Sequence, residues 1–324
     1  MIRTRLTELV GCTAPIQQAP MGTVSSPSLA VAVAEAGGIG SFNTLGVTRE
    51  ALRRHLEGMR ERTDGVLAVS FLTNDIDADA VADAASRVRI VDFFWSDPRP
   101  DLVDIAHRGG ALVNWQVGSV GEARAAVQAG ADMVSAQGVE AGGHCRGETP
   151  LLLLLCEVLD AVDVPVLAAG GIADARGVAA ALAAGASGVR MGTRFIATEE
   201  SAAHPDYVAA ILAAGANSTR ITDAFNDCPL CASSPLARVL ISAIEAVEAV
   251  DIDVVGTKRG AAGEISVPRR SWIPPTQDIS GQIEAMCMYA GESVALVNTV
   301  VPASQLVRSL IEDAEALFER VQRS

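Results

Sequence analysis

Eight short, continuously apolar segments recur along the first two-thirds of the chain, and this repeat constrains the fold more than any other feature. Their equivalent ends are about 20 to 30 residues apart, which is the length of one strand, one helix and two short loops. Continuous rather than alternating apolar runs are typical of parallel strands covered on both faces. The predicted strands are Ile16–Met21, Gly38–Phe42, Val66–Phe71, Ile90–Trp95, Ala111–Val117, Met133–Gly138, Val164–Gly171 and Gly188–Phe195.

Eight units of this kind predict an α/β protein with the closed (β/α)8, or TIM, barrel fold. Between the strands lie alanine-rich stretches with helix signals, among them Thr48–Arg60, Ser119–Ala129 and Asp174–Ala184. The last two begin with a residue suited to the N-cap and end before a glycine. Only 4% of the residues are aromatic, so the core must be built from small and branched side chains. A doubly wound open sheet is the structural alternative.

The β/α rhythm stops after Phe195. The sequence that follows contains predicted helices at Tyr207–Ala214 and Leu236–Val250, with loops rich in Asn, Pro and Gly. An amphipathic stripe over Pro302–Val321 then predicts the final helix of the barrel. Because barrel active sites lie at the carboxyl ends of the strands, we expect a helical insertion that covers this end. The expected division is residues 1–205 and 285–324 for the barrel and 206–284 for the insertion.

The formal net charge of −14 excludes some classes of partner. Such a surface repels phosphate backbones, so we expect no nucleic-acid and no membrane partners. The sequence has no run of about 18 apolar residues and no signal-peptide core, and the expected location is cytoplasmic. The six cysteines fit reduced cytosolic thiols. The Cys228/Cys231 CxxC loop lacks two further ligands nearby, so two free thiols are favoured and no metal site is expected.

Two glycine-rich turns follow the seventh and eighth predicted strands. Gly170-Gly171 precedes a helix that begins at Asp174, and Met191-Gly192-Thr193 follows the next strand. Phosphates commonly bind at these loops of a barrel, because glycine lets the backbone approach and N–H groups supply donors. Two ordinary turns are the alternative, but their adjacency favours a phosphate site that needs no lysine cluster.

His144 is the candidate catalytic residue. It follows Gly142 and Gly143, which remove side chains beside a ligand, and it lies past the end of the sixth predicted strand. An imidazole at the mouth of the barrel is suited to proton transfer near neutral pH. The other histidines lie on or just before predicted helices, where a structural role is favoured: His55, His107 and His204.

Further strand ends carry candidate ligand contacts. Ala19-Pro20-Met21 ends the first strand with a rigid, apolar surface suited to a flat ring, although a simple strand cap is the alternative. Gln116 and Gln137 end the fifth and sixth strands. Amides there are suited to bonding the edge of a heterocycle, although solvent-facing glutamine is common.

With these motifs the sequence resembles the nitronate monooxygenase family, formerly called 2-nitropropane dioxygenases. The resemblance depends on four stretches in the expected order and on a weaker C-terminal match. They are Gln18-Ala-Pro-Met21-Gly, Ala136-Gln-Gly-Val-Glu-Ala-Gly-Gly-His144, Pro165-Val-Leu-Ala-Ala-Gly-Gly-Ile172, Val189-Arg-Met-Gly-Thr-Arg-Phe-Ile-Ala-Thr-Glu-Glu200 and Tyr289-Ala-Gly-Glu. The combination is specific for the flavin-dependent superfamily and less specific for the reaction.

The resemblance implies a barrel that binds flavin mononucleotide (FMN), with His144 as the active-site histidine. The family pattern implies three groups of cofactor contacts. They are Ala19, Pro20 and Met21 along the flavin ring, Gln116 and Gln137 at its polar edge, and Gly142, Gly143, Gly170, Gly171, Met191, Gly192 and Thr193 near the ribityl phosphate. Ser70 replaces the Asn of many relatives, and this shorter side chain is expected to change a contact to the flavin. Phe225–Ser234 matches no family pattern and is expected to shape the substrate pocket.

The first functional expectation is an FMN-dependent nitronate monooxygenase that oxidises alkyl nitronates with O2 to carbonyl compounds and nitrite. His144 would hold the nitronate oxygens or remove the α-proton of a neutral nitroalkane. The alternative enzyme is an NAD(P)H-dependent FMN reductase of the enoyl-acyl-carrier-protein reductase or quinone reductase type, because enoyl reductases share the EAGGH stretch. A flavin-binding protein without catalysis is a third hypothesis. The expected partners are a small-molecule nitronate or nitroalkane and O2, with a homodimer as a possible assembly.

Overall fold

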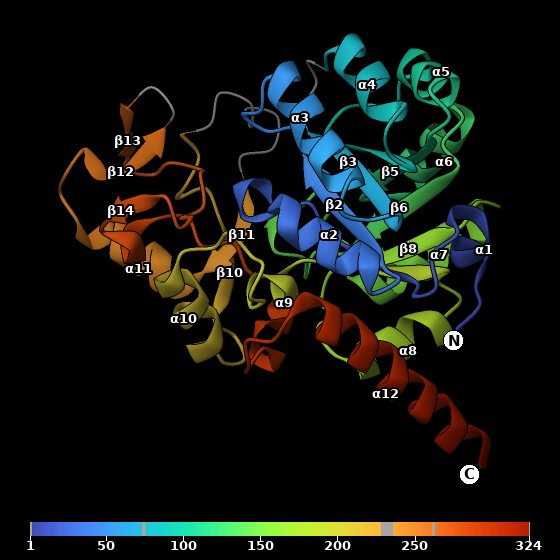
Figure 1. Ribbon diagram of the computed structural model, residues 1–324. Helices are drawn as coiled ribbons and strands as arrows, with labels where there is room; N and C mark the ends of the chain where they lie inside the picture. Colours follow the sequence, from blue (N-terminus) through green and yellow to red (C-terminus); the bar gives the residue numbers. More distant parts are fainter. Residues whose placement is uncertain (1, 73–75, 228–235, 261–262, 324) are drawn as a thin grey trace.

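A closed barrel of parallel strands forms the centre of the computed structural model, which describes residues 2–72, 76–227, 236–260 and 263–323 (Figure 1). The strands are β1 (Ile16–Gln18), β2 (Ile39–Asn43), β3 (Val66–Leu72), β4 (Ile90–Phe94), β5 (Leu112–Val117), β6 (Met133–Gln137), β8 (Val166–Ala169) and β9 (Gly188–Met191). They follow one another around the barrel, and β9 pairs back with β1. All eight predicted strands are present, and the closure confirms the (β/α)8 barrel over the open sheet.

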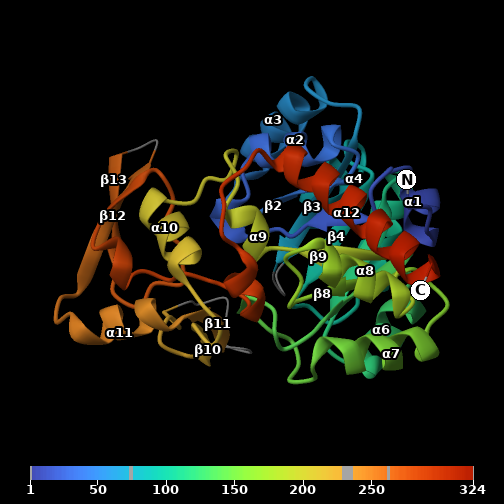
Figure 2. The same cartoon turned by 90° about the horizontal axis from the view of Figure 1, so that it is seen from below.

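The helices between the strands form the outer layer of the barrel. They are α2 (Pro27–Glu35), α3 (Arg49–Arg60), α4 (Ala78–Ala85), α5 (Pro100–Arg108), α6 (Val120–Gln128), α7 (Leu151–Ala161), α8 (Ala175–Ala183) and α12 (Ala303–Arg323). The side chains of Ser119 and Asp174 cap α6 and α8 as predicted, and Thr48 caps α3 in the same way. The C-terminal helix α12 packs against α8 and α2 and completes the ring (Figure 2), which confirms its predicted place.

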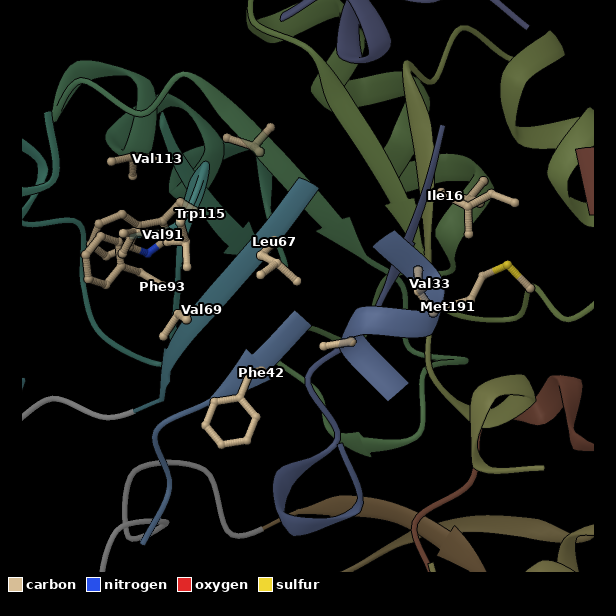
Figure 3. Packing of buried hydrophobic residues seen from close by; sticks show 14 of the residues in the cluster. Ile16, Val33, Phe42, Leu67, Val69, Val91, Phe93, Val113, Trp115 and Met191 are labelled. Atoms are coloured by element: carbon tan, nitrogen blue, oxygen red, sulfur yellow. The ribbon is translucent and has the colours of Figure 1, made fainter. Parts of the chain in front are cut away.

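An apolar layer between strands and helices holds the barrel together (Figure 3). Phe93 and Trp115 stack with ring centroids 4.6 Å apart, and Val91 and Val113 extend the same buried face. Successive residues of a strand point to opposite faces of the sheet. The residues between these apolar side chains therefore face the barrel interior.

Inside the barrel the inward side chains change from apolar to polar along the strands. At the amino ends, Ile39, Val66 and Ile90 pack with Leu6 of α1 (Arg5–Val10), which closes this end. One step further along lies a set of buried polar side chains that we call the polar layer. Its members are Gln17, Ser41, Ser70, Asp92, Asn114, Ser135 and Arg190.

A buried ion pair lies within the polar layer. A guanidinium nitrogen of Arg190 on β9 is 3.2 Å from a carboxylate oxygen of Asp92 on β4, and the two side chains are 3% and 1% exposed. Asp92 also accepts hydrogen bonds from the amides of Gln17 and Asn114, and Asn114 donates to Ser135 as well. A charge this deeply buried is tolerated only when it is paired and hydrogen-bonded. The network therefore joins strands from opposite sides of the barrel.

The segment 206–284 contains strands beside its helices, which corrects the expectation of a helical insertion. Its elements include α10 (Pro205–Ala213), β10 (Thr219–Thr222), β11 (Ala237–Leu240), α11 (Ile241–Ala249), β12 (Val254–Gly260), β13 (Gly263–Pro268) and β14 (Ile279–Gly281). The predicted helix Leu236–Val250 begins as a strand, because Ala237–Leu240 is buried and pairs with β10 and with a short strand near His144. The β12–β13 hairpin is largely exposed and lacks the apolar run that would have revealed it.

The structure bears on only part of what we expected for the cysteines and for membrane binding. Cys228 and Cys231 lie outside the described residues. Within the described ranges, no group of three or more His, Cys, Asp and Glu side chains is arranged to hold a metal. Across the same ranges, each helix is too short or too polar to cross a bilayer.

Removing one partner of the buried ion pair should destabilise the barrel. In Asp92→Ala, Arg190 keeps a buried charge without its carboxylate, and the free energy of unfolding should fall by about 3–5 kcal/mol. Urea unfolding followed by circular dichroism measures the change. Replacing both partners in Asp92→Ala/Arg190→Met should recover much of the loss, whereas Glu319→Ala in the exposed pair with Arg323 should have little effect. A stable Asp92→Ala variant would show that the pair does not hold the strands together.

Candidate active site

A pocket opens at the carboxyl ends of the barrel strands, next to the polar layer. Its walls enclose about 1380 Å³, part of which is open to solvent, and Arg190 of the polar layer belongs to its lining. The lining residues at several strand ends each lie two positions after a member of the polar layer. They are Ala19, Leu72, Phe94, Gln116, Gln137 and Gly192. Strand alternation therefore places the pocket wall on the inward face, one layer above the buried polar network.

Most of the predicted site residues line this one pocket. They are Ala19, Pro20, Met21, Gln116, Gln137, Gly142, Gly143, His144, Gly170, Gly171, Gly192 and Thr193. The structure therefore brings together loops that follow β1, β5, β6, β8 and β9. Segments from 206–284 also reach the pocket through Tyr207, Trp272 and Pro274.

Two predicted cofactor residues, Ser70 and Met191, lie outside the pocket lining. Met191 is 1% exposed and packs in the layer between strands and helices (Figure 3), because its neighbour Arg190 faces inward. Ser70 is fully buried in the polar layer, and its hydroxyl has no hydrogen-bond partner among the residues described. The family pattern placed Ser70 and Met191 near the ligand. The Met191 side chain instead points outward from the barrel, and the Ser70 side chain lies one layer below the pocket surface.

The site glycines serve different structural needs. A Cβ at Gly142 would lie 2.6 Å from the backbone nitrogen of Gly291, so this glycine allows two main chains to pack together. Gly143, Gly170 and Gly171 have φ angles of 76°, 108° and 68°, which side chains disfavour. A Cβ at Gly192 would meet nothing closer than 3.6 Å. A Cβ at Gly192 would therefore make ordinary van der Waals contacts with the side chains of Ala19 and Met21.

The His144 loop is held from two sides. Gly143–His144 forms the short strand β7, which pairs with Ala237 and Arg238 of β11. The Gln137 amide nitrogen donates to the His144 carbonyl at 2.9 Å, and the Gln137 amide oxygen accepts from the Arg146 N–H at 3.1 Å. Gln137 thus lines the pocket and also anchors the loop, a role that the sequence did not predict.

Aromatic rings surround the His144 imidazole. The Trp95 ring meets it edge-on with centroids 4.2 Å apart, and the Tyr289 ring lies 5.8 Å away. The Tyr289 hydroxyl donates to the Trp272 carbonyl at 2.7 Å, and the Tyr207 hydroxyl donates to the Tyr289 carbonyl. Burial raises the pKa of both tyrosines well above the ordinary value, so both phenols stay neutral at physiological pH.

The C-terminal Tyr289-Ala-Gly-Glu stretch is docked against the pocket. The Gly291 N–H donates to the Thr193 hydroxyl at 2.9 Å, and the Glu292 N–H donates to the Glu140 carbonyl at 2.9 Å. Arg238 of β11 lies 3.0 Å from the Glu292 carboxylate. The Thr193 hydroxyl is therefore used in joining two parts of the chain.

Several pocket residues were not predicted as site residues from the sequence. Trp95 was used only to mark a strand end, and Tyr289 only as part of a weak motif. Tyr207 and Trp272 carried no local signal, because their roles depend on partners far away in the sequence. The strand end at Trp95 and the inward register of Arg190 were the only clues available.

Cys145 follows His144 but is poorly suited to be a nucleophile. Burial raises the pKa of its thiol to about 11, partly opposed by the nearby Arg238 charge. A thiol with that pKa is almost entirely protonated near pH 7, and the thiolate is the reactive form. The His144 imidazole is therefore better suited than this thiol to proton transfer near neutral pH.

The pocket residues fit a ligand with a flat ring and a polar tail. The Thr23 hydroxyl and the Trp95 indole N–H both belong to lining residues, are buried, and have no hydrogen-bond partner within the described chain. Buried polar groups of this kind are normally satisfied. Gly170, Gly171 and Gly192 offer backbone without side chains on the β8 and β9 side. FMN is one ligand that has both a flat ring and a polar tail.

A closed β/α barrel with a histidine, aromatic rings and glycine turns around one pocket at its carboxyl ends defines a TIM-barrel enzyme. The nitronate monooxygenase family model matches residues 3–85 and 68–313. The chain therefore belongs to the nitronate monooxygenase family, a family of flavin-dependent oxidoreductases.

Three similar proteins extend this comparison. A nitronate monooxygenase of Paraburkholderia phytofirmans is 28% identical, with 98% of this chain and 97% of that protein covered. The "(3aS,4S,5R,7aS)-5-hydroxy-7a-methyl-1-oxo-octahydro-1H-indene-4-carboxyl-CoA dehydrogenase" of Rhodococcus jostii is 40% identical over 68% of this chain, and the match spans only 63% of that relative. The solved structure of FabK from Thermotoga maritima has a TM-score of 0.82 at 30% identity, covering 99% of each chain.

Proposed function

We propose that the chain is an FMN-dependent nitronate monooxygenase in which the substrate binds beside His144. The observation that supports this most is the imidazole, held by β11 and Gln137 at a pocket that the glycine turns after β8 and β9 also line. Membership of the family supports the reaction class. The reaction would convert an alkyl nitronate and O2 into a carbonyl compound and nitrite.

The protein's own contribution is position and proton transfer. The glycine turns after β8 and β9, with Gly192, would hold the phosphate, and Ala19, Pro20 and Met21 would contact the ring. His144 would take the α-proton of a neutral nitroalkane on its imidazole, which leaves the nitronate anion in the pocket. With a preformed nitronate, the same imidazole would only bind its oxygens. FMN, when bound, supplies the electron acceptor for the oxidation.

The sequence also motivates proposals about the rest of the molecule. We propose that residues 206–284 act as an insertion that covers the mouth of the barrel, with residues 1–205 and 285–324 forming the barrel. Tyr207, Trp272 and Pro274 in the pocket lining support this division. A homodimer and a cytoplasmic location stay predictions.

Gly192→Asp should abolish FMN binding while the barrel still folds. The space at Gly192 accepts a Cβ, so the fold should tolerate the side chain, but a carboxylate there would repel the phosphate. FMN content after purification and the affinity of the apoprotein for added FMN measure the effect. Gly192→Ala is the matched control and should retain FMN. A Gly192→Asp variant with normal FMN content would move the phosphate site elsewhere.

A second candidate is a dehydrogenase or NAD(P)H-dependent reductase that acts on a bulkier substrate. The carboxyl-CoA dehydrogenase relative is more similar in the matched region than the nitronate monooxygenase is. Phe94 and Trp95 form a buried cluster with Leu72 and Trp272 packed against it, and all four line the pocket. This apolar wall suits a large ring as well as a small alkyl chain. In that reaction His144 would exchange a proton with a hydroxyl or carbonyl oxygen.

Anaerobic mixing separates the two candidates. The holoenzyme is mixed with propyl-2-nitronate, with NADH and with NADPH in separate experiments, and the flavin absorbance is followed. The nitronate should reduce the flavin rapidly and neither nicotinamide should, because the nitronate is the electron donor in the proposed reaction. Rapid reduction by NADH or NADPH with no reduction by nitronate would reverse the order of the candidates. Failure of all three would contradict both.

His144→Ala should separate proton removal from substrate positioning. Oxidation of neutral 2-nitropropane should fall by about 100-fold or more, the usual scale for loss of a general base. Oxidation of propyl-2-nitronate should fall less, because its α-proton is already gone, and FMN should stay bound. Steady-state kinetics with both substrates provide the test, with His107→Ala on the outer helix α5 as the control. Equal losses on both substrates would indicate a positioning role, and no loss on either would remove His144 from the mechanism.

A further inference from the structure

Trp95 has a backbone conformation that a bulky residue rarely adopts. It follows β4 with a φ angle of 74°, in the left-handed region that favours glycine. Such strain persists where the surrounding structure imposes it, often at functional sites. With this backbone conformation Trp95 lines the pocket, and the residue is 8% exposed.

The neighbouring rings hold this indole in one place. The centroid of the Phe94 ring lies 5.3 Å from the centroid of the Trp95 ring. The centroid of the His144 imidazole lies 4.2 Å from it, and the planes of the imidazole and the indole meet at 70°. Leu72 and Trp272 pack against the same cluster. The direction of the indole N–H is therefore set before any ligand binds.

The indole nitrogen of Trp95 is buried and has no hydrogen-bond partner among the residues that the structure describes. Trp115 provides the contrast within the same barrel, because its indole N–H donates to the Ser96 carbonyl at 3.3 Å. An indole N–H only donates, and a buried donor without an acceptor is costly. A strained backbone that holds an unsatisfied donor at a pocket points to a ligand oxygen as the missing acceptor.

The position of Trp95 favours the substrate over the cofactor phosphate. In the barrel order, β4 lies opposite β9, whose following turn contains Gly192. Trp95 is also in direct ring contact with His144. The donor therefore lies on the proposed substrate side.

We propose that the Trp95 indole N–H donates a hydrogen bond to an oxygen of the substrate, beside the His144 imidazole. The group that it recognises is a planar, negatively charged oxygen pair, as in a nitronate. This inference rests on the proposed function, because that function places the substrate beside His144. Trp95 moves no proton, and its part is to bind and orient the oxygen.

Nitrate binding tests this donor without turnover, because nitrate is planar and carries similar oxygens but has no α-carbon to oxidise. Nitrate is titrated into the oxidised holoenzyme, and the perturbation of the flavin absorbance gives its Kd. Trp95→Phe keeps an aromatic ring but removes the N–H, and it should weaken nitrate binding by about 10- to 100-fold, the range for a hydrogen bond to a charged group. The KM for propyl-2-nitronate should rise in parallel, with FMN content unchanged. Trp115→Phe removes an indole N–H that lies outside the pocket lining, and it should leave nitrate binding nearly unaltered.

Indole ¹⁵N–H resonances provide a second measurement on the unmodified holoenzyme. The chain has three tryptophans, so three indole signals are expected. Nitrate should shift the Trp95 signal strongly and leave the Trp115 signal in place, because Trp115 is already bonded to Ser96. This measurement tests the inference even if Trp95→Phe fails to fold.

The outcomes distinguish this inference from the proposed function. Unchanged nitrate affinity in Trp95→Phe, or an unshifted Trp95 signal, would overturn the inference. Loss of FMN from Trp95→Phe, together with a Trp95 signal that nitrate does not shift in the wild-type holoenzyme, would show that the donor serves the cofactor, which also overturns the inference. If the wild type binds nitrate through Trp95 but does not oxidise nitronates, the proposed function fails and the anion-binding role of Trp95 stands.

Discussion

The Arg190–Asp92 ion pair is the interaction on which the pocket depends. It joins β9 to β4 across the barrel, at the level where the interior changes from apolar to polar. Both side chains are deeply buried, so each charge is tolerated only because the other is present and because Gln17 and Asn114 also bind the carboxylate. Two residues further along these strands, the same inward face becomes the pocket wall. A polar floor of this kind replaces the apolar packing that would otherwise fill the barrel to its end.

The segment 206–284 completes the site that the barrel begins. Its strand β11 pairs with β7 and so fixes the backbone of His144, while Arg238 on the same strand bonds the Val139 carbonyl and contacts Glu292. Tyr207 and Trp272 then hold Tyr289 through their hydrogen bonds. The histidine is thus positioned by parts of the chain on both sides of it. The segment 206–284 therefore contributes more than lining residues, because β11 pairs with the backbone of the residue proposed to do chemistry.

The pocket also concentrates the features that cost stability. Trp95 is strained, and the hydroxyl of Thr23 and the indole N–H of Trp95 are buried without partners in the described structure. Elsewhere in the barrel, the Trp115 indole N–H and the other polar-layer side chains are hydrogen-bonded, and the Ser70 hydroxyl is the exception in that layer. Natural proteins retain such defects mainly where a ligand resolves them. Their location in the lining of one pocket fits a site built for a flat cofactor and a small oxygen-bearing substrate.

The sequence alone determined the barrel and part of the pocket lining, because both depend on local patterns. Continuous apolar runs, N-caps at Ser119 and Asp174, and glycines after the last two strands each act within a few residues. The relative positions of distant residues were decided only by the tertiary structure. Arg190 meets Asp92 across 98 positions of sequence, and the strand β11 that pairs with His144 occupies the start of a predicted helix. Trp95 and Tyr289 became neighbours of His144 only when the barrel closed and the C-terminal segment docked, because no local propensity specifies a contact between strands that are far apart in the chain.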